Sequence, residues 1–135
     1  MGGLDRFVRA QETTWAGALG ELRAGAKHGH WMWFVFPQLA GLGHSSTARH
    51  YAIADPAEAR AYLAHPVLGP RLVEATQALL AHRERPPDAI LGSIDAMKLR
   101  SSLTLFEAAG GDPIFAEALD AFYGGKRDPL TLALL

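Results

Sequence analysis

The chain has 135 residues, of which 49% are hydrophobic and 20% charged, a balance typical of a folded globular domain and not of a disordered chain. Its formal net charge of −1 and the lack of a Lys/Arg run argue against electrostatic binding to nucleic acid or to an anionic membrane. The absence of cysteine excludes disulfides, iron–sulfur clusters, thiolate zinc sites and a cysteine nucleophile. We therefore expect a single cytoplasmic domain over residues 1–135, without a signal peptide or a membrane span.

The first expected element is an amphipathic helix over about residues 4–24, where apolar residues recur at three- and four-residue steps. Gly25 is expected to end it as a C-cap. Gln11 lies on the apolar face, one turn from Phe7 and one turn from Trp15. Two interpretations of this glutamine stay open. Its amide could reach water at the edge of the apolar stripe, or it could be buried, held by hydrogen bonds and offered to a ligand.

The densest group of large side chains follows over residues 28–38, in the sequence His-Gly-His-Trp-Met-Trp-Phe-Val-Phe-Pro-Gln. Nearly every position is apolar, so periodicity does not distinguish a short strand from a buried helical turn. Most of these aromatic side chains are expected in the core. The alternative is that one or two rings, with Trp31 and Trp33 as candidates, line a pocket and stack on a planar ligand. Gln38 would then supply a polar contact.

A glycine-rich loop comes next, in the sequence Gly-Leu-Gly-His-Ser-Ser over residues 41–46. Ser45 or Ser46 could cap a short helix through its side-chain oxygen. The loop has the small residues and nearby Arg49 that an anion site at a helix start would need. It lacks a Walker lysine and a preceding strand. An anion site and a plain capped loop are therefore both kept as interpretations.

Three Asp-Pro pairs, at residues 55–56, 112–113 and 128–129, each place an N-cap acceptor before a proline at the first helical position. They predict the starts of three helices. A longer helix is expected after Pro70, ending before Pro86. The last helix is short and rich in leucine, and we expect it to dock on the fold and not to fray.

The helix expected over about residues 93–109 carries apolar side chains around much of its circumference, which predicts that it is the central helix. It also carries Lys98, Arg100, Ser101 and Ser102. Buried polar groups need hydrogen-bond partners. We therefore expect these four side chains to meet protein partners or a ligand.

No segment shows convincing period-two alternation or a hairpin signal. The sequence predicts an all-α fold of about six or seven helices around the central helix at residues 93–109. The histidines lack the spacing of a zinc motif, and no carboxylates cluster beside a histidine pair. No serine lies in a Gly-x-Ser-x-Gly elbow. We expect no metal site and no cofactor.

Several motifs along the chain resemble a bacterial family of uncharacterised proteins, domain of unknown function 1810, whose members are sometimes labelled calpastatin. Its Trp-Met-Trp-Phe and Lys-Leu-Arg-Ser-Ser blocks occur here at residues 31–34 and 98–102. The resemblance implies a small, mainly α-helical fold with no established activity. This chain has Gly29 where the family has a serine before His-Trp. The matching segments are residues 5–7, 10–11, 30–38, 41–43, 59–63, 65–72, 98–106 and 122–125.

These observations lead to one principal hypothesis, a small-molecule binding domain that could also be catalytic. The pocket would lie between the first helix, the aromatic stretch and the central helix. The ligand would be small, planar and anionic, such as a nucleotide derivative. A fold-level similarity to small helical proteins that process ADP-ribose gives one example of such a ligand. His30 is the candidate general acid or base. The expected binding residues are Gln11, Trp31, Trp33, Gln38, Lys98, Arg100, Ser101 and Ser102.

The alternative is a protein-interaction module or homodimer without a small-molecule site. The apolar segment Leu130–Leu135 and the pair Phe122–Tyr123 would then form the contact surface. The direction of the polar side chains on the central helix separates the two hypotheses. Convergence of Lys98, Arg100 and Ser102 on a cavity with His30 or Gln38 favours a pocket. Pairing with carboxylates such as Asp95 or Glu107 favours a structural role and the interaction module.

Overall fold

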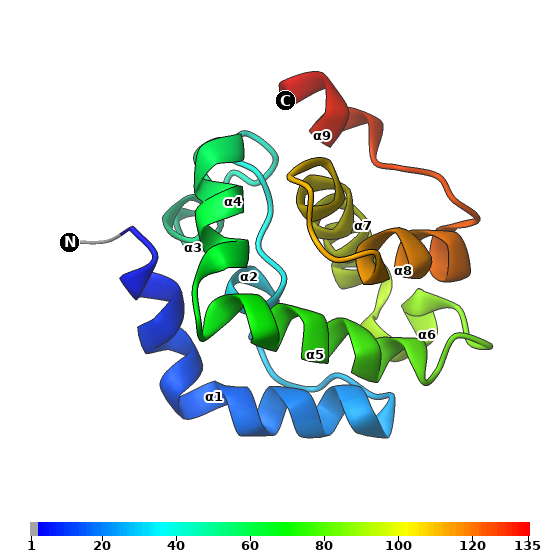
Figure 1. Ribbon diagram of the computed structural model, residues 1–135. Helices are drawn as coiled ribbons and strands as arrows, with labels where there is room; N and C mark the ends of the chain where they lie inside the picture. The colour runs from blue at the N-terminus through cyan, green and yellow to red at the C-terminus, as the bar shows by residue number, and fades with distance from the viewer. Residues whose placement is uncertain (1–2) are drawn as a thin grey trace.

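The computed structural model describes residues 3–135, which form nine helices and no strand beyond an isolated bridge between Leu39 and Ile53 (Figure 1). The predicted all-α fold is confirmed. Two short helices raise the number above the predicted six or seven: α6, which was not expected, and α2, which lies in the stretch left open between a strand and a helical turn. The helices are α1 (Asp5–Ala24), α2 (Met32–Val35), α3 (Ser46–His50), α4 (Pro56–Ala64), α5 (Leu68–Leu80), α6 (Pro87–Leu91), α7 (Ser93–Ala108), α8 (Ile114–Tyr123) and α9 (Pro129–Leu134).

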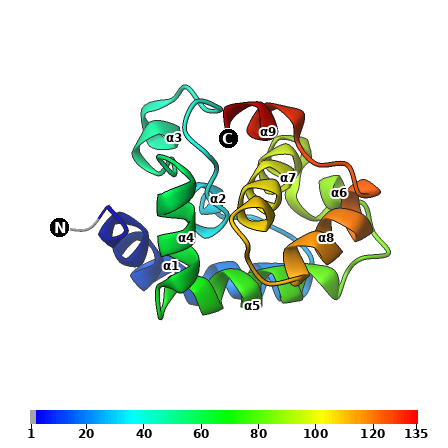
Figure 2. The same ribbon diagram turned by 45° about the horizontal axis from the view of Figure 1, so that its top comes forward.

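Helix α7 is central, as predicted, and it ends one residue earlier than expected. Figure 2 shows it between α4, α8 and α9. Residues 101–106 are all buried, so every side of this part of the helix faces protein. The first turns differ. Ile94 and Met97, expected to belong to the apolar circumference, are 70% and 73% exposed, because they lie on the side of α7 opposite Ala96 and Leu99, which are buried.

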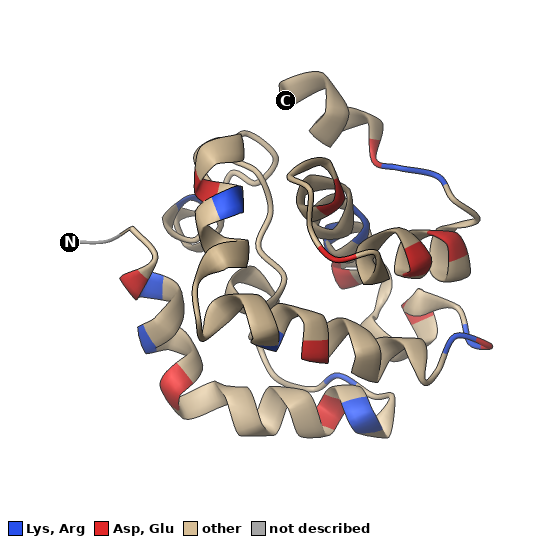
Figure 3. Ribbon diagram, viewed as in Figure 1, with Lys and Arg blue, Asp and Glu red and all other residues tan. Residues whose placement is uncertain are grey.

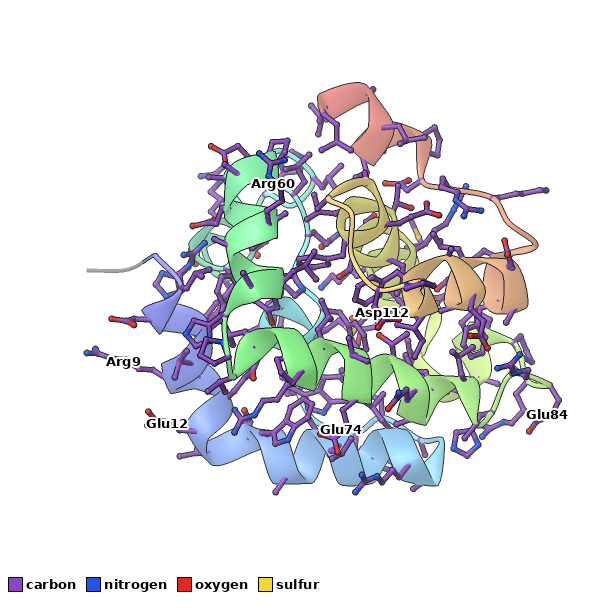
Figure 4. All side chains as sticks on the ribbon, in the orientation of Figure 1. Arg9, Glu12, Arg60, Glu74, Glu84 and Asp112 are labelled. Atoms are coloured by element: carbon purple, nitrogen blue, oxygen red, sulfur yellow. The ribbon has the colours of Figure 1, made fainter. Side chains whose placement is uncertain are left out.

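Helices α1 and α5 pack side by side beneath the other helices in the view of Figure 1. Gly25 ends α1 with φ 73°, the left-handed conformation of the predicted C-cap. A line of aromatic contacts crosses the core from α1 through α4 and α7 to α8, with ring centroids 5.2–6.1 Å apart. The residues in this line are Phe7, Tyr62, Phe106 and Phe115. On the outer side of α1, Arg9 and Glu12 point away from the fold (Figure 4).

The aromatic stretch forms a helical turn, α2, which resolves the choice between strand and helix. Met32, Phe34 and Val35 are buried, and Trp33 is half-buried because it points away from that face. The preceding loop is held by Glu21 of α1. One of its carboxylate oxygens accepts hydrogen bonds from the backbone N–H of His28 and Gly29 and from the indole of Trp31.

Two of the three predicted Asp-Pro caps are confirmed, at Asp55 and Asp128, each of which accepts the backbone N–H three residues on. At the third, Asp112 bonds to the N–H only two residues on, and α8 begins after the proline. The expected helix after Pro70 begins earlier, at Leu68. The ring nitrogen of His65 accepts the N–H groups of residues 67 and 68 and so caps α5.

Lys and Arg residues lie interspersed with Asp and Glu residues along the helices, as the colours in Figure 3 show. Within residues 3–135, none of the helices is both long enough and apolar enough to cross a bilayer.

Candidate functional site

A cavity of about 510 Å³ lies where the loop before α3 meets α7 and the start of α9. Figure 2 shows α9 lying over α7, with that loop reaching the end of α9. We call this space the Trp33 cavity. Five of the eight predicted binding residues line it: Trp33, Gln38, Lys98, Arg100 and Ser101.

The Lys98 ammonium lies over the indole of Trp33, with Nζ 4.6 Å from the ring centroid. Such a contact is a cation–π interaction and holds both side chains in place. Among the residues that the structure describes, 3–135, the one carboxylate paired with this ammonium is that of Asp95, whose Oδ1 lies 3.8 Å away. The other oxygen of Asp95 lies 2.7 Å from Nζ of Lys27. One carboxylate therefore serves two ammonium groups, and it is bonded more closely to Lys27.

Gln38 is placed by the bridge between the two segments that flank α3. Its backbone carbonyl accepts the N–H of Ile53 at 2.9 Å, and the N–H of Ala40 bonds back to the carbonyl of Ile53 at 2.8 Å. The side chain is half-buried and lines the Trp33 cavity. Its amide makes no hydrogen bond to residues 3–135, so it can both donate to and accept from a bound molecule.

Arg100 lines the cavity, but its guanidinium group is used largely by the protein. Nε donates to the carbonyl of Lys126 and Nη2 to that of Arg127, each at 2.8 Å. These bonds clamp the segment between α8 and α9 onto α7. The expected role as the main anion contact therefore falls more naturally to Lys98 than to Arg100.

Ser101 meets a carboxylate of the protein. Its hydroxyl donates to Oδ2 of Asp128 at 3.0 Å, and the same oxygen accepts the hydroxyl and the N–H of Thr131 at 2.6 and 3.1 Å. The backbone N–H of Asp128 donates to the hydroxyl of Thr104. Ser101 is thus part of the attachment of α9 to α7, although it also forms part of the cavity wall.

Gln11 is buried, in line with the second of its two interpretations, but the structure places it away from the Trp33 cavity. Its amide nitrogen donates to the carbonyl of Phe34 at 2.7 Å and to the hydroxyl of Tyr62 at 3.3 Å. Its oxygen accepts from Arg71 at 3.3 Å. Burial raises the pKa of the Tyr62 phenol, and the neighbouring Gln11 and Arg71 only partly oppose this. The amide joins α1, α2, α4 and α5.

Trp31 and Ser102 also lie inside the fold. The Trp31 side chain is enclosed between Glu21, which accepts its indole N–H at 3.0 Å, and Lys27, whose Nζ lies 5.0 Å from the ring centroid. The hydroxyl of Ser102 is fully buried and has no hydrogen-bond partner within residues 3–135. Neither residue lines the Trp33 cavity.

His30 faces a second hollow, of about 590 Å³, on the other side of the tryptophan. The hollow is open, and its walls include His50 and Tyr51 of the segment at α3. Trp33 contributes to both spaces, whereas His30 is exposed and lines only the second. The candidate acid or base is therefore not brought together with Gln38 and Lys98.

The rest of the Trp33 cavity comes from residues that were not proposed as binding residues. Some of them were recognised in the sequence, but as helix caps and not as binding residues. Asp128 was expected only as a helix cap. Ser45, which accepts the N–H of Ala48 at 3.1 Å, is the cap, one of the two serines considered for that role. The glycine-rich loop leads into a helix of only five residues. The additional wall residues are Leu42, Gly43, His44, Ser45, Ala48, Ile94, Met97, Asp128 and Leu130.

A larger hollow of about 810 Å³ lies between α4, α5 and the turn from α7 to α8. Arg60 and Asp112, labelled in Figure 4, stand on its two sides. Its carboxylates have other partners, since Asp112 bonds to the first turn of α8 and Glu74 pairs with Arg23 of α1. None of the predicted binding residues lines it. We therefore regard the Trp33 cavity as the better candidate.

No group of three or more His, Asp or Glu side chains within residues 3–135 is arranged to hold a metal ion. The polar groups of the Trp33 cavity are an ammonium, a guanidinium, an imidazole, an amide, hydroxyls and one carboxylate. Such groups bind organic ions and hydrogen-bonding molecules.

Comparisons with known proteins place the chain among proteins of unknown activity. The crystal structure of the conserved hypothetical protein Rv1873 from Mycobacterium tuberculosis, at 1.38 Å, is similar, with 49% sequence identity and a TM-score of 0.95. The match covers 98% of this chain and 95% of that one. No curated protein matches. The family model described as "Protein of unknown function (DUF1810)" matches residues 2–135, and the chain therefore belongs to this family.

Proposed function

We propose that the protein binds a small anionic molecule with a flat or apolar body in the Trp33 cavity. The observation that carries this proposal is the position of Lys98, whose ammonium lies against an aromatic ring in the cavity wall and has only a shared carboxylate at 3.8 Å. A cation held in this way is oriented in advance. It can pair with a phosphate or carboxylate without first leaving a strong ion pair.

The charge balance of the wall supports an anion. Asp95 lies between the two lysines, and its close contact is with Lys27, whose side chain is only 8% exposed. Asp128 lines the cavity too, but it accepts three hydrogen bonds from Ser101 and Thr131. Lys98 and Arg100 therefore both bring positive charge to the cavity wall, and of the two only Arg100 is held by short hydrogen bonds to the protein, at 2.8 Å to two backbone carbonyls.

The shape and lining support a ligand with a flat or apolar part. The volume of about 510 Å³ lies within the range of about 300–1,000 Å³ common for ligand sites. Ile94, Met97 and Leu130 give one wall an apolar surface. Trp33 offers an aromatic surface, and Gln38 a free amide to fix orientation. A nucleotide derivative, including one of the ADP-ribose type, has this combination of a flat base and a phosphate anion.

The proposal assigns binding and no reaction step. His30, the candidate acid or base, lines the open hollow beyond Trp33 and not the cavity itself. A general acid or base must come within hydrogen-bond reach of the group that it serves. Any catalytic use of His30 would therefore require a ligand that extends around Trp33 into the second hollow.

The test is a thermal-shift and tryptophan-fluorescence titration with AMP, ADP, ADP-ribose and inorganic phosphate as probes. At about one hundred times its dissociation constant, a ligand should stabilise the fold by about 2.7 kcal/mol. Lys98→Gln should weaken binding by about tenfold or more, because it removes a charge-assisted contact. Lys126→Gln is the matched control, since Lys126 is exposed and does not line the cavity.

Binding that Lys98→Gln leaves unchanged would contradict the proposed site. A well-folded protein that responds to none of these probes would contradict the proposed ligand class. Loss of binding in both lysine variants would indicate a general charge effect and would also count against the site.

A further inference from the structure

The exposed large apolar side chains of the protein are gathered in one region. Within residues 3–135, the six that are exposed all come from the first turns of α7, from α9 or from the residue that follows α9. Single exposed leucines are normal, but a cluster is the usual mark of an interaction surface. We call this cluster the α9 patch. Its members are Ile94, Met97, Leu130, Leu132, Leu134 and Leu135, with exposed fractions between 43% and 73%.

Helix α9 is attached to the fold by its polar groups and not by its leucines. Thr131 is its only buried side chain, and it bonds to the Asp128 carboxylate that Ser101 also contacts. Arg100 clamps the segment before it. We expected this leucine-rich helix to dock, and it does, but with its apolar side chains outward. In the single chain, burial of apolar surface therefore contributes little to the stability of a helix attached in this way.

The α9 patch is continuous with the Trp33 cavity. Ile94, Met97 and Leu130 belong to the patch and also line the cavity. Leu134, one turn beyond Leu130, lies at the loop before α3, where a Cβ added to Gly41 would come within 3.3 Å of it. The mouth of the cavity is therefore bordered by exposed apolar side chains.

We propose that a second copy of this chain packs on the α9 patch in a two-fold symmetric dimer, and that it covers the mouth of the Trp33 cavity. A two-fold interface uses the same patch on both copies, so it needs a surface that complements itself. An apolar patch whose cations, Lys98 and Arg100, are engaged with Trp33 and with backbone carbonyls meets this requirement.

The size of the patch agrees with this occupant. At roughly 200 Å² for a fully exposed side chain of this kind, the six residues present roughly 700 Å², more than the largest patch on most monomers. A stable interface takes about 800 Å² from each partner. A membrane surface is less suitable, because α9 has six residues without a charged side chain, whereas membrane-surface helices are usually longer and carry Lys or Arg on their polar face.

The second copy would complete the wall of the Trp33 cavity, but formation of the dimer does not depend on a ligand in that cavity. With the second copy in place, its leucines would add apolar walls beside Met97 and Leu130 and exclude water from the ligand. The association itself requires no ligand. Its failure would therefore leave the proposed binding function untouched, and the two proposals can be tested apart.

The experiment measures the mass of the full-length chain by sedimentation velocity and light scattering over a wide range of concentration, without added ligand. We expect a reversible dimer. Leu132→Glu on α9 and Met97→Glu on α7 should each raise the dimer dissociation constant by about a hundredfold. Because the interface is two-fold symmetric, each substitution buries two carboxylates there, one from each copy. Both side chains are at least half exposed in the single chain, so both variants should remain folded.

The matched control is Ala61→Glu, which adds the same charge at an exposed position of α4 outside the α9 patch and should dimerise like the unmodified chain. Circular dichroism confirms that each variant is folded. A monomeric mass at every concentration would overturn the proposal and leave the patch to another protein or to the apolar part of a ligand. A dimer that neither Leu132→Glu nor Met97→Glu weakens would overturn it as well.

Discussion

The interior of the protein and the Trp33 cavity contain the same three residue types in opposite situations. Trp31 and Trp33 are two residues apart, and each has a lysine over its ring, Lys27 at 5.0 Å and Lys98 at 4.6 Å. The two lysines share Asp95, at 2.7 and 3.8 Å. The interior pair is sealed by protein groups, whereas the second pair faces a cavity.

The glutamines repeat this contrast. Gln11 is 1% exposed, and its amide bonds to three protein groups, whereas Gln38 is half-buried with its amide free. Polar groups that are buried and fully bonded maintain a fold, and polar groups left free in a cavity wall can bind a ligand. Neither the residue type nor the local motif therefore distinguishes a structural residue from a binding residue here. The distinction depends on the partners that distant segments of the chain supply.

The largest expected effect comes from the two tryptophans. Trp31→Ala should destabilise the fold by about 3–5 kcal/mol, because it removes a large buried ring and leaves Glu21 without the indole N–H. Trp33→Ala should cost about 1–2 kcal/mol, because that ring is half-exposed, but it should abolish the fluorescence response to ligand. Urea denaturation of both variants measures the difference. Equal losses of stability would contradict the contrast between interior and cavity.

The two lysines should give a smaller difference. Lys27→Met removes a nearly buried ammonium that bonds Asp95 and the carbonyl of Gly29, and we expect a loss of about 2–3 kcal/mol. Lys98→Met should cost about 1 kcal/mol or less, because its ion pair is longer and its side chain is 23% exposed. The free energy of unfolding of each variant checks this. A Lys98 variant as unstable as the Lys27 variant would mean that Lys98 is chiefly structural.

Local signals in the sequence were sufficient for much of the fold. The all-α class, the C-cap at Gly25 and the caps at Asp55 and Asp128 depend on residues within one helical turn, and all are confirmed. The start of α5 was missed because its cap is His65, a residue type outside the usual Ser, Thr, Asp and Asn. The helix α6 was missed because Pro87 reads as a stop but serves here as its first residue.

The candidate site depended on tertiary contacts that no local pattern contains. Arg100 looked like an anion contact, but the carbonyls that occupy it come from the segment 26 and 27 residues further on. The leucine-rich last helix was expected to dock on the fold, but Thr131 is the side chain that α9 buries. Five of the eight predicted binding residues nevertheless line one cavity, in which the aromatic stretch meets the central helix, but the first helix, expected as its third wall, does not line it.

The smallest expected effect concerns Glu21, which holds the loop between α1 and the two tryptophans. Burial raises the pKa of its carboxyl, but the N–H groups of Gly29 and His28 and the Trp31 indole outweigh this and hold the pKa below its usual value. A carboxyl with a lowered pKa in the folded state stabilises the fold above its unfolded pKa, and this contribution is lost as the pH falls through the folded pKa. Glu21→Gln should therefore cost about 1 kcal/mol at neutral pH, and the difference from the unmodified chain should shrink in acid. Denaturation across this pH range measures the difference. The variant should still bind ligand, because Trp33 does not depend on this carboxylate. A stability difference that stays constant with pH would mean that the hydrogen bonds, and not the charge of Glu21, cause the effect.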